Sequence, residues 1–509
     1  MDIDAKELLK KINDSIGSRE VFKNNIEDLV SCLIEVSRDI NMLSLFLVDD
    51  ITKKEYVDQY RTILKFIYTY SSFDNVTTMK TSDIQKEFTR MTMEFKNKYS
   101  PVRNYLAQCS VRKKEISYDE KKDLYYEKEP ESYSNYARVR DKDKIYPSLK
   151  YKVEAQEYIN HFFNPKKDKI KYFFKQPVAI KAIDSMIEAN YLDSEIKGDY
   201  DFEDFKYSEL IEFCAGLQFI GMFCSSYFIV KNTNYINKED MVSYLLDLTS
   251  LSREKIEFFL DVNTYDYDFQ KDKLTLFQSL VLINNKYYFY PITLTIGFLP
   301  MKMYRVLCLN KKYSNYQKHI PKIAKLKEEQ MTNTIIDVLK KYDLNIESNY
   351  IIKDNKGRKL AEFDLLIYDK KENELYVCEC KWHYAKDDEK DNAKLDDMLK
   401  KEISERKEKN KLLEQNINKV ISDCGFNCEN PAIIPFLISQ NNLGSTKFNM
   451  TVVDYDTIEE EIEKYDSFKE LMDSIINEKY KEEIKTNNTQ QLIELENYRF
   501  YIYNIEVEY

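Results

Sequence analysis

The chain has 509 residues, of which 43% are hydrophobic and 32% are charged, with a formal net charge of −11 at pH 7. This acidic balance argues against a protein that binds nucleic acid over its whole surface. The length predicts about two to four domains. Only 8 Gly and 10 Pro occur, and this scarcity favours long helices over an all-β fold with many turns.

Residues 1 to about 110 repeat apolar side chains at three- and four-residue spacing and therefore predict helices. Residues 111–150 are charged and poorly periodic, which favours a linker or a long surface loop. The first predicted domain is thus helical, covers residues 1–150 and ends in this charged linker. Because the chain opens on an amphipathic helix and its cysteines lie mostly in apolar runs, we expect reduced thiols and a cytoplasmic location.

The second predicted domain covers residues 151–315, is mainly helical and ends in strands around Asn284-Asn285. Residues 213–230 carry no charge, and eighteen such residues are the lower edge of a membrane-spanning helix. Gln218 and two serines interrupt the segment, and no other segment supports a membrane protein. We therefore predict a buried helix and no membrane partner.

A basic row precedes the last third of the chain. No Asp or Glu occurs from Lys273 through Lys327. Six lysines near its end are predicted to contact nucleic-acid phosphates, although lysines on a helix can also serve only to solvate it. These six are Lys311, Lys312, Lys318, Lys322, Lys325 and Lys327.

The third predicted domain, residues 316–509, alternates helices and strands. A helix is followed by three strands in sequence, a long helix at about 390–421, two more strands and another helix, which predicts an α/β domain with a mixed sheet. The long helix is mixed in charge and is predicted to present a solvated face. Cys424 and Cys428 could begin a zinc site, but no second pair or nearby His completes it.

Carboxylates interrupt two of these apolar strands, and burying a charge is costly unless it is paired or holds a metal. Because side chains alternate along a strand, a hairpin would bring Asp364 and Glu379 together with Lys381 beside them. Two adjacent carboxylates repel unless a cation lies between them. Mg²⁺ takes carboxylate and backbone carbonyl oxygens, lowers the pKa of bound water and polarises a phosphate.

The segments EFD and ECK, joined by a hairpin, resemble the pattern of the PD-(D/E)xK nuclease superfamily, also called the restriction-endonuclease-like fold. The order of elements matches over about residues 316–460. The resemblance implies Mg²⁺- or Mn²⁺-dependent hydrolysis of phosphodiesters, with Asp364 as the metal-binding Asp, Glu379 as the second acid and Lys381 as the lysine. Cys380, between the last two, is assigned as a further metal ligand. No Pro precedes the acid in AEFD, which departs from the family pattern, although many members also lack that Pro.

The family's helix often supplies a further Glu, and here Glu328 and Glu329 are both available. Glu328 shares a helical face with Ile335 and Leu339 and is the first choice, while Glu329 is the second. The predicted catalytic residues are therefore Asp364, Glu379, Lys381 and Glu328.

The expected fold class is α+β: a large, mainly helical N-terminal region followed by a restriction-endonuclease-like α/β domain. The function expected from the resemblance is a DNA endonuclease, with a place in bacterial antiviral defence, as restriction or abortive infection, suggested by analogy. An RNA-cleaving nuclease and a catalytically inactive scaffold or nucleic-acid-binding subunit are the alternatives. Besides nucleic acid, a protein partner or a second copy could bind through the helical region.

Overall fold

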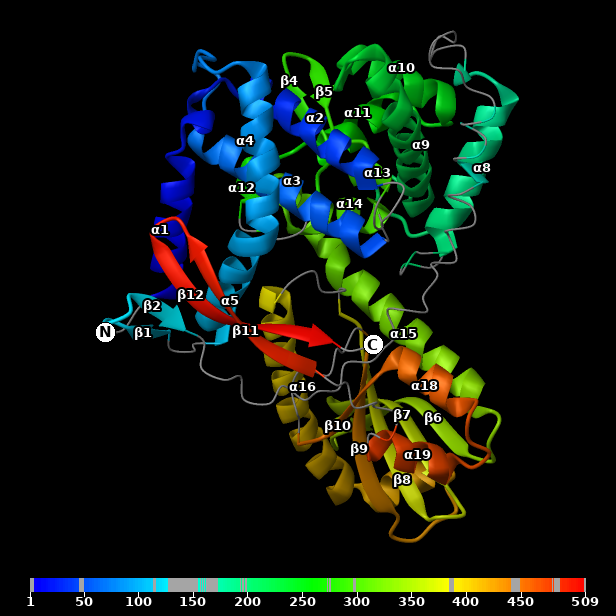
Figure 1. Cartoon of the computed structure of the whole chain (residues 1–509). Coiled ribbons are helices and arrows are strands. Elements are labelled where there is room, and N and C mark those ends of the chain that lie inside the picture. Colours follow the sequence, from blue (N-terminus) through cyan, green and yellow to red (C-terminus); the bar gives the residue numbers. More distant parts are fainter. Residues whose placement is uncertain are drawn as a thin grey trace.

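A computed structural model describes the chain over the following residues, together with isolated positions at 154–161 and beside the gaps: 4–44, 50–112, 116–126, 173–192, 199–271, 276–295, 299–383, 389–440, 449–477 and 486–507. The protein is a mixed α+β molecule. Figure 1 shows its helical N-terminal and middle regions side by side, and a sheet-containing C-terminal region beyond them.

The N-terminal helices form one core. Their apolar stripes, spaced three and four residues apart, meet around side chains such as Phe22, Leu33 and Phe66, which are buried. A π-helical turn, Phe95–Tyr99, joins the last two helices. The helices are α1 (Ala5–Gly17), α2 (Ile26–Ser44), α3 (Asp50–Tyr70), α4 (Thr81–Glu94) and α5 (Ser100–Arg112).

The middle region surrounds one apolar helix. Residues 213–230 lie in α9 (Tyr207–Lys231) and are largely buried, as predicted for a core helix. No helix in the described part of the chain combines the length and apolarity needed to cross a membrane. The other helices are α8 (Pro177–Leu192), α10 (Lys238–Leu248), α11 (Arg253–Val262), α12 (Tyr267–Gln270), α13 (Ile292–Thr295) and α14 (Leu299–Leu309).

A small sheet in this region confirms the predicted Asn-Asn hairpin. Asn284 and Asn285 have φ values of 49° and 60°, the left-handed conformation that a two-residue hairpin turn requires. The sheet order is β3-β5-β4, with β3 (Tyr235–Asn237), β4 (Val281–Ile283) and β5 (Lys286–Tyr288).

The C-terminal region is a five-stranded mixed sheet between helices. Its order is β10-β9-β8-β7-β6, in which β6, β7 and β8 are antiparallel neighbours and β8, β9 and β10 are parallel. The strands are β6 (Asn345–Lys353), β7 (Lys359–Asp369), β8 (Glu374–Lys381), β9 (Ala432–Ser439) and β10 (Thr451–Asp454).

Helices cover both faces of this sheet, which explains why its central strands are apolar on both sides. One face packs on α15 (Ile320–Leu339), α18 (Tyr455–Ile462) and α19 (Phe468–Ile476). The other packs on α16 (Glu389–Gln415) and α17 (Ile417–Cys424). Figure 1 shows that α15 also links this region to the helical part of the molecule.

The last strands depart from the predicted domain boundaries. β11 (Thr486–Leu495) and β12 (Tyr498–Val507) fall within residues 316–509, yet they pair with β1 (Ser117–Asp119) and β2 (Leu124–Tyr126) in the order β1-β2-β12-β11. The inner face of this sheet, with Ile493 and Phe500, packs into the N-terminal core. The reason is that the hairpin has one apolar face, which the N-terminal helices cover. The predicted linker likewise contains β1 and β2, while residues 127–150 lie outside the described part.

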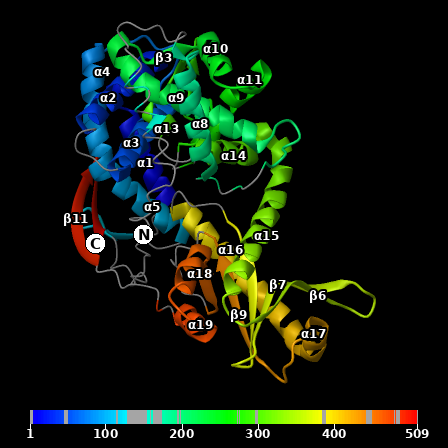
Figure 2. The same ribbon diagram turned by 90° about the vertical axis from the view of Figure 1, so that its right-hand side faces the viewer.

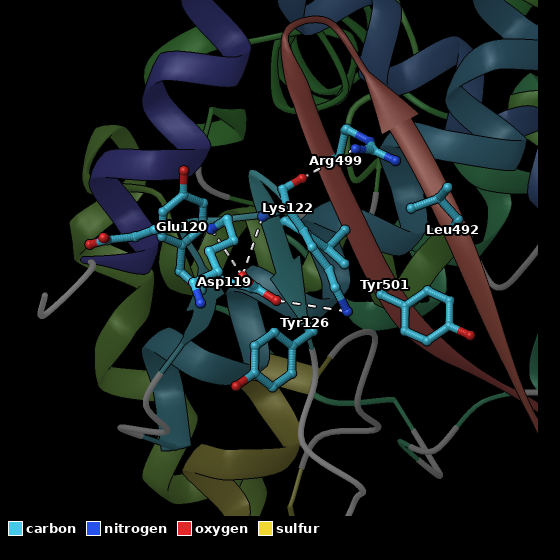
Figure 3. Close-up of a pocket in the computed structure, with 10 residues that line it drawn as sticks. Asp119, Glu120, Lys122, Tyr126, Leu492, Arg499 and Tyr501 are labelled. Atoms are coloured by element: carbon cyan, nitrogen blue, oxygen red, sulfur yellow. Dashed lines mark hydrogen bonds and ion pairs between the residues drawn. The ribbon is translucent and has the colours of Figure 1, made fainter.

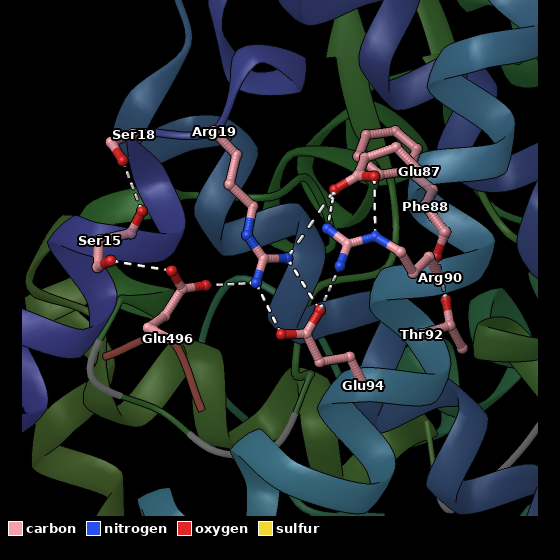
Figure 4. A network of polar contacts seen from close by, with 9 residues as sticks. All are labelled: Ser15, Ser18, Arg19, Glu87, Phe88, Arg90, Thr92, Glu94 and Glu496. Atoms are coloured by element: carbon pink, nitrogen blue, oxygen red, sulfur yellow. Dashed lines mark hydrogen bonds and ion pairs between the residues drawn. The ribbon is translucent and has the colours of Figure 1, made fainter. Parts of the chain in front are cut away.

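An ion-pair network fixes this hairpin to the N-terminal helices (Figure 4). Arg19 donates to both carboxylate oxygens of Glu94, at 3.1 and 2.7 Å, and to Glu496 at the β11–β12 turn. Glu496 also accepts from the hydroxyl of Ser15 at 2.9 Å. Arg90 closes the network by pairing with Glu94 at 3.4 Å. Distant parts of the sequence are thereby joined through one guanidinium group.

Candidate active site

The site lies where β7 bends. Phe363 and Leu365 are two residues apart and would share a face of a regular strand, but they pack into different cores. Asp364 lies between them. The β6–β7 pairing omits Asp364 and the residue opposite it, Asn349, whose φ is 55°. A bend at this point turns the Asp364 carboxylate toward β8, where its Oδ2 accepts a hydrogen bond from the backbone N–H of Cys380 at 2.7 Å.

The predicted hairpin between β7 and β8 is confirmed, with Leu365 opposite Cys378 as its last regular pair. The next residues in that register are Asp364 and Glu379, so the two acids stand on neighbouring strands where the regular pairing ends. The two acids are therefore neighbours, as the sequence interpretation expected, although the bend at Asp364 as well as the strand register sets the direction of its carboxylate.

Glu379 is buried, at 5% exposure, and three cations surround it. Its Oε2 lies 2.5 Å from a guanidinium nitrogen of Arg406, and its Oε1 lies 3.0 Å from Nζ of Lys409 and 3.1 Å from Nζ of Lys381. Burial by itself would raise the pKa of Glu379, but Lys381, Arg406 and Lys409 lower it below its ordinary value. Glu379 is consequently ionised and held in one orientation.

Lys381 joins the strand acids to α15. Its Nζ lies 3.7 Å from Oε2 of Glu328, whose Oε1 accepts from the backbone N–H of Trp382 at 3.4 Å. Glu329 instead is exposed and lies 3.8 Å from Lys325. Of the two helix acids left open by the sequence, the structure thus brings Glu328 to the other predicted residues and leaves Glu329 on the surface.

The acids here are electrostatically unequal. Burial, and then the charge of Glu379, raise the pKa of Asp364. Burial also raises the pKa of Glu328. Burial opposes the charged form of Lys381, yet Glu379, Glu328 and Asp364 together raise the pKa of its ammonium group. Of the four predicted residues, one is therefore a firmly ionised carboxylate, one is a permanent cation, and two are acids with an increased tendency to hold a proton.

The donor types here suit a hard divalent cation, but the observed arrangement is incomplete as a metal site. Asp364 and Glu379 are carboxylates, and a cation near them would relieve the repulsion that raises the pKa of Asp364. However, the described residues contain no group of three or more His, Cys, Asp or Glu side chains placed to hold a metal. Both oxygens of Glu379 already contact cations, so a metal ion there would have to displace Lys381 or Lys409 from Oε1, or Arg406 from Oε2.

Two members of this cluster were missed from the sequence, because the helix at 390–421 was predicted to be a solvated face. That prediction is wrong for α16 at Arg406, which is 2% exposed and stacks over the ring of Phe363 at 5.0 Å. A usable signal existed, since Arg406 and Asn410 continue a four-three spacing of buried residues that includes Leu399, Ile403 and Leu413. Lys409 follows one turn after Arg406 on the same side.

A fourth acid, Glu402 on α16, also faces this cluster. Burial raises the pKa of Glu402, and Lys381 opposes that shift. Glu402, Arg406 and Lys409 are spaced four and three residues apart, which places them along one side of the helix. The sheet acids are thus enclosed between α15, which supplies Glu328, and α16.

The six lysines of the basic row are not brought to the site as a group. Lys312 and Lys318 are exposed but lie 2.6 Å from Asp261 and Glu203, acids that are distant in sequence. Lys325 pairs with Glu329 at 3.8 Å. Lys327 is buried, which departs from the prediction of a surface contact, whereas Lys311 and Lys322 are exposed. Residues 273–327 contain no acid, but folding brings acids from outside this range next to three of these lysines and so neutralises part of their charge.

Two other features lie apart from the site. A pocket of about 840 Å³ lies on the four-stranded sheet, and no predicted site residue lines it. Its lining includes Tyr126, Arg499 and Tyr501 (Figure 3). Cys424 and Cys428 are free thiols, and within the described ranges neither joins a group of metal-ligating side chains. Burial raises the pKa of Cys424 to about 12.

Comparisons with protein-family models, with curated proteins and with solved structures found no match for this chain.

Proposed function

We propose that this protein is a metal-dependent nuclease of the restriction-endonuclease-like class that hydrolyses phosphodiester bonds in DNA. One observation carries the proposal: Asp364, Glu379, Lys381 and Glu328, selected on sequence pattern alone, come from three elements and lie around one another at the bend of β7. The order of α15, the β6–β7–β8 meander, α16 and the parallel strands β9 and β10 agrees with the resemblance.

The roles of the residues follow from their contacts. Asp364 and Glu379 would hold Mg²⁺, with the backbone carbonyl of Cys380 as a further oxygen donor. The ion, when bound, would supply an activated water and a charge that polarises the scissile phosphate.

Lys381 has a raised pKa, so it keeps its proton and can stabilise negative charge that develops on the phosphate. Arg406 and Lys409 keep Glu379 ionised and oriented. Glu328 holds Lys381 from the side of α15.

The test is an activity panel on the purified protein. Duplex DNA, single-stranded DNA and RNA are incubated with Mg²⁺, Mn²⁺ or a chelator, using wild type and Lys381→Ala. We expect cleavage of DNA only with a divalent ion, and a loss of at least about 100-fold in Lys381→Ala, the scale for removing one stabiliser of transition-state charge. Binding and folding should be retained. Equal cleavage by the variant would remove Lys381 from the mechanism, and preferential cleavage of RNA would replace DNA as the substrate.

One observation favours a second candidate, a catalytically inactive scaffold that binds nucleic acid. Glu379 is already neutralised by three cations, an arrangement that is complete without a metal. Tight, metal-independent binding with no cleavage under any divalent ion would support this alternative. For the nuclease, a place in bacterial defence is proposed from the analogy to chains that join a large helical region to such a domain.

A further inference from the structure

The β6–β7 hairpin continues past the rest of the sheet. β7 pairs with β8 only from Leu365 to Asp369, whereas its pairing with β6 runs on to Lys359. Residues 350–363 therefore form a two-stranded arm that begins at the bend beside Asp364. Figure 2 shows this hairpin projecting away from the body of the C-terminal region.

The base of the arm is held in place. Ile352, Ala361 and Phe363 are buried in the core that also contains Val420 and Phe426, at and just after α17. Tyr350 adds a hydrogen bond from its hydroxyl to Asp423 at 2.9 Å. The arm is consequently a supported ribbon with a fixed direction, in contrast to a free loop.

The tip of the arm is exposed and basic. Lys353, Lys356, Arg358 and Lys359 are all exposed, and Asp354 is the one acid among residues 353–360. This is a local excess of three positive charges in a chain whose net charge is −11.

The turn at the tip is well defined. Oδ1 of Asp354 accepts from the backbone N–H groups of Lys356 and Arg358, both at 2.8 Å, and Gly357 adopts a φ of 79° that other residues tolerate poorly. The acid is thereby engaged within the turn, where it also pairs with Nε of Arg358 at 2.7 Å, and Lys359 pairs with Glu362. These two cations are partly neutralised, but the side chains of all four stay exposed at the tip.

An exposed, basic, two-stranded ribbon beside the proposed phosphodiesterase site matches the major groove of duplex DNA in shape and charge. The major groove of B-form DNA, about 12 Å wide, admits a two-stranded β-ribbon, and lysine and arginine can reach the phosphates on both of its edges. The major groove of A-form RNA is too deep and narrow for this. We propose that the β6–β7 arm docks in the major groove of duplex DNA and so selects duplex DNA as the substrate. This inference rests on the proposed nuclease function.

The position of the arm agrees with that role. Arg358 lies six positions before Asp364, which corresponds to about 20 Å at roughly 3.3 Å per residue of strand. The tip would therefore contact DNA within one helical turn of the bond presented to Asp364. Leu360, 49% exposed on the arm, offers an apolar contact to thymine methyl groups or sugar edges there.

The experiment measures binding separately from cleavage, in Lys381→Ala protein so that substrate is preserved. One variant adds K353Q, K356Q, R358Q and K359Q to this background, and a matched control adds K6Q, K10Q, K80Q and K86Q, exposed lysines of the N-terminal region. Affinity for a 30-base-pair duplex is measured by fluorescence anisotropy over a salt series. We expect the arm variant to bind at least about tenfold more weakly and its salt slope to fall by about 2–3, while the control changes little.

A second duplex tests the groove itself. In DNA whose 5-hydroxymethylcytosine carries glucose, the sugar fills the major groove. The Lys381→Ala parent should bind this DNA more weakly than unmodified DNA, whereas the arm variant should bind both equally. Equal losses in the arm variant and the control, or equal effects of glucosylation on both proteins, would overturn the arm's role. Such a result leaves the nuclease proposal intact, because cleavage in the activity panel is scored independently. A wild type that neither binds nor cleaves any duplex overturns both proposals.

Discussion

Two ion-pair networks in this protein have opposite compositions. In the first, shown in Figure 4, Arg19 lies among the carboxylates of Glu87, Glu94 and Glu496. In the second, Glu379 lies among the cations of Lys381, Arg406 and Lys409. Each central group has three opposite charges around it, and both networks join elements that are far apart in the sequence. The number of ion pairs therefore does not distinguish a structural network from a functional one.

The two networks differ in how well the other polar groups around the central residue are paired. In the Arg19 network, Arg90 neutralises Glu87 and Glu94, and Ser15 hydrogen-bonds Glu496, so the acids are well paired. In the Glu379 network, Asp364 and Glu328 have raised pKa values, and two guanidinium nitrogens of Arg406 are buried with no hydrogen-bond partner among the residues that the structure describes. Buried carboxylates with raised pKa values and buried donors without hydrogen bonds are typical of sites whose polar interactions are completed by a ligand.

The largest expected effect on stability comes from breaking the Glu379 network. In Arg406→Met, Glu379 stays buried, and its remaining partners are Lys381 and Lys409, which are more exposed than Arg406. Removing one partner of a buried ion pair costs about 3–5 kcal/mol. The free energy of unfolding from urea titrations measures this. The double variant Glu379→Gln, Arg406→Met should lose less than the sum of the two single variants. Additive losses would show that the two side chains do not depend on each other.

The next effect concerns Asp364 and a metal ion. A raised carboxyl pKa in the folded state lowers stability as pH rises from the ordinary value of 3.8 toward the folded value. In chelator, Asp364→Asn should therefore be more stable than wild type at pH 7, with a difference that shrinks as pH is lowered toward 4.

Added Mg²⁺ should make wild type more stable than Asp364→Asn at pH 7. At 100 times its Kd, it would stabilise wild type by about 2.7 kcal/mol and the Asn variant far less. Unfolding titrations at both pH values, with and without Mg²⁺, give all the comparisons. The same Mg²⁺ effect in both proteins would exclude Asp364 as a ligand.

A smaller effect is expected from the Arg19 network. Arg19→Met removes hydrogen bonds to partly buried carboxylates and should lower the free energy of unfolding by about 1–3 kcal/mol. Cleavage per folded molecule should stay at the wild-type level, since the network is structural. A selective loss of cleavage in this variant would make the two networks functionally equivalent and contradict the comparison drawn above.

The smallest effect is expected from the basic row. Neutralising Lys318, Lys322 and Lys325 to Gln should weaken DNA binding and flatten its salt dependence, but by less than the arm substitutions. The reason is that two of these three lysines pair with acids, whereas the arm variant removes four cations, of which two pair with acids. Anisotropy titrations of both variants on the same duplex give the comparison. An identical salt slope in this variant and wild type would assign these lysines to a solvated face.

Local patterns predicted the core of the site. Alternation along two strands identified Asp364, Glu379 and Lys381 as neighbours, and helical periodicity ranked Glu328 above Glu329, as the structure has them. Local patterns failed where the partner is remote in sequence. Arg406 and Lys409 were assigned to a solvated helix because nothing in residues 390–421 indicates that a buried carboxylate lies opposite them.

The sequence by itself determined the element order over about residues 316–460, the mainly helical character of the N-terminal and middle regions and the position of the acidic hairpin. These depend on side-chain periodicity and turn chemistry within short segments. Only the tertiary structure decided which charges are neutralised, where β7 bends, and that β11 and β12 join the N-terminal core. The physical reason is that ion pairing and burial depend on distances between segments, and folding fixes those distances between residues up to hundreds of positions apart.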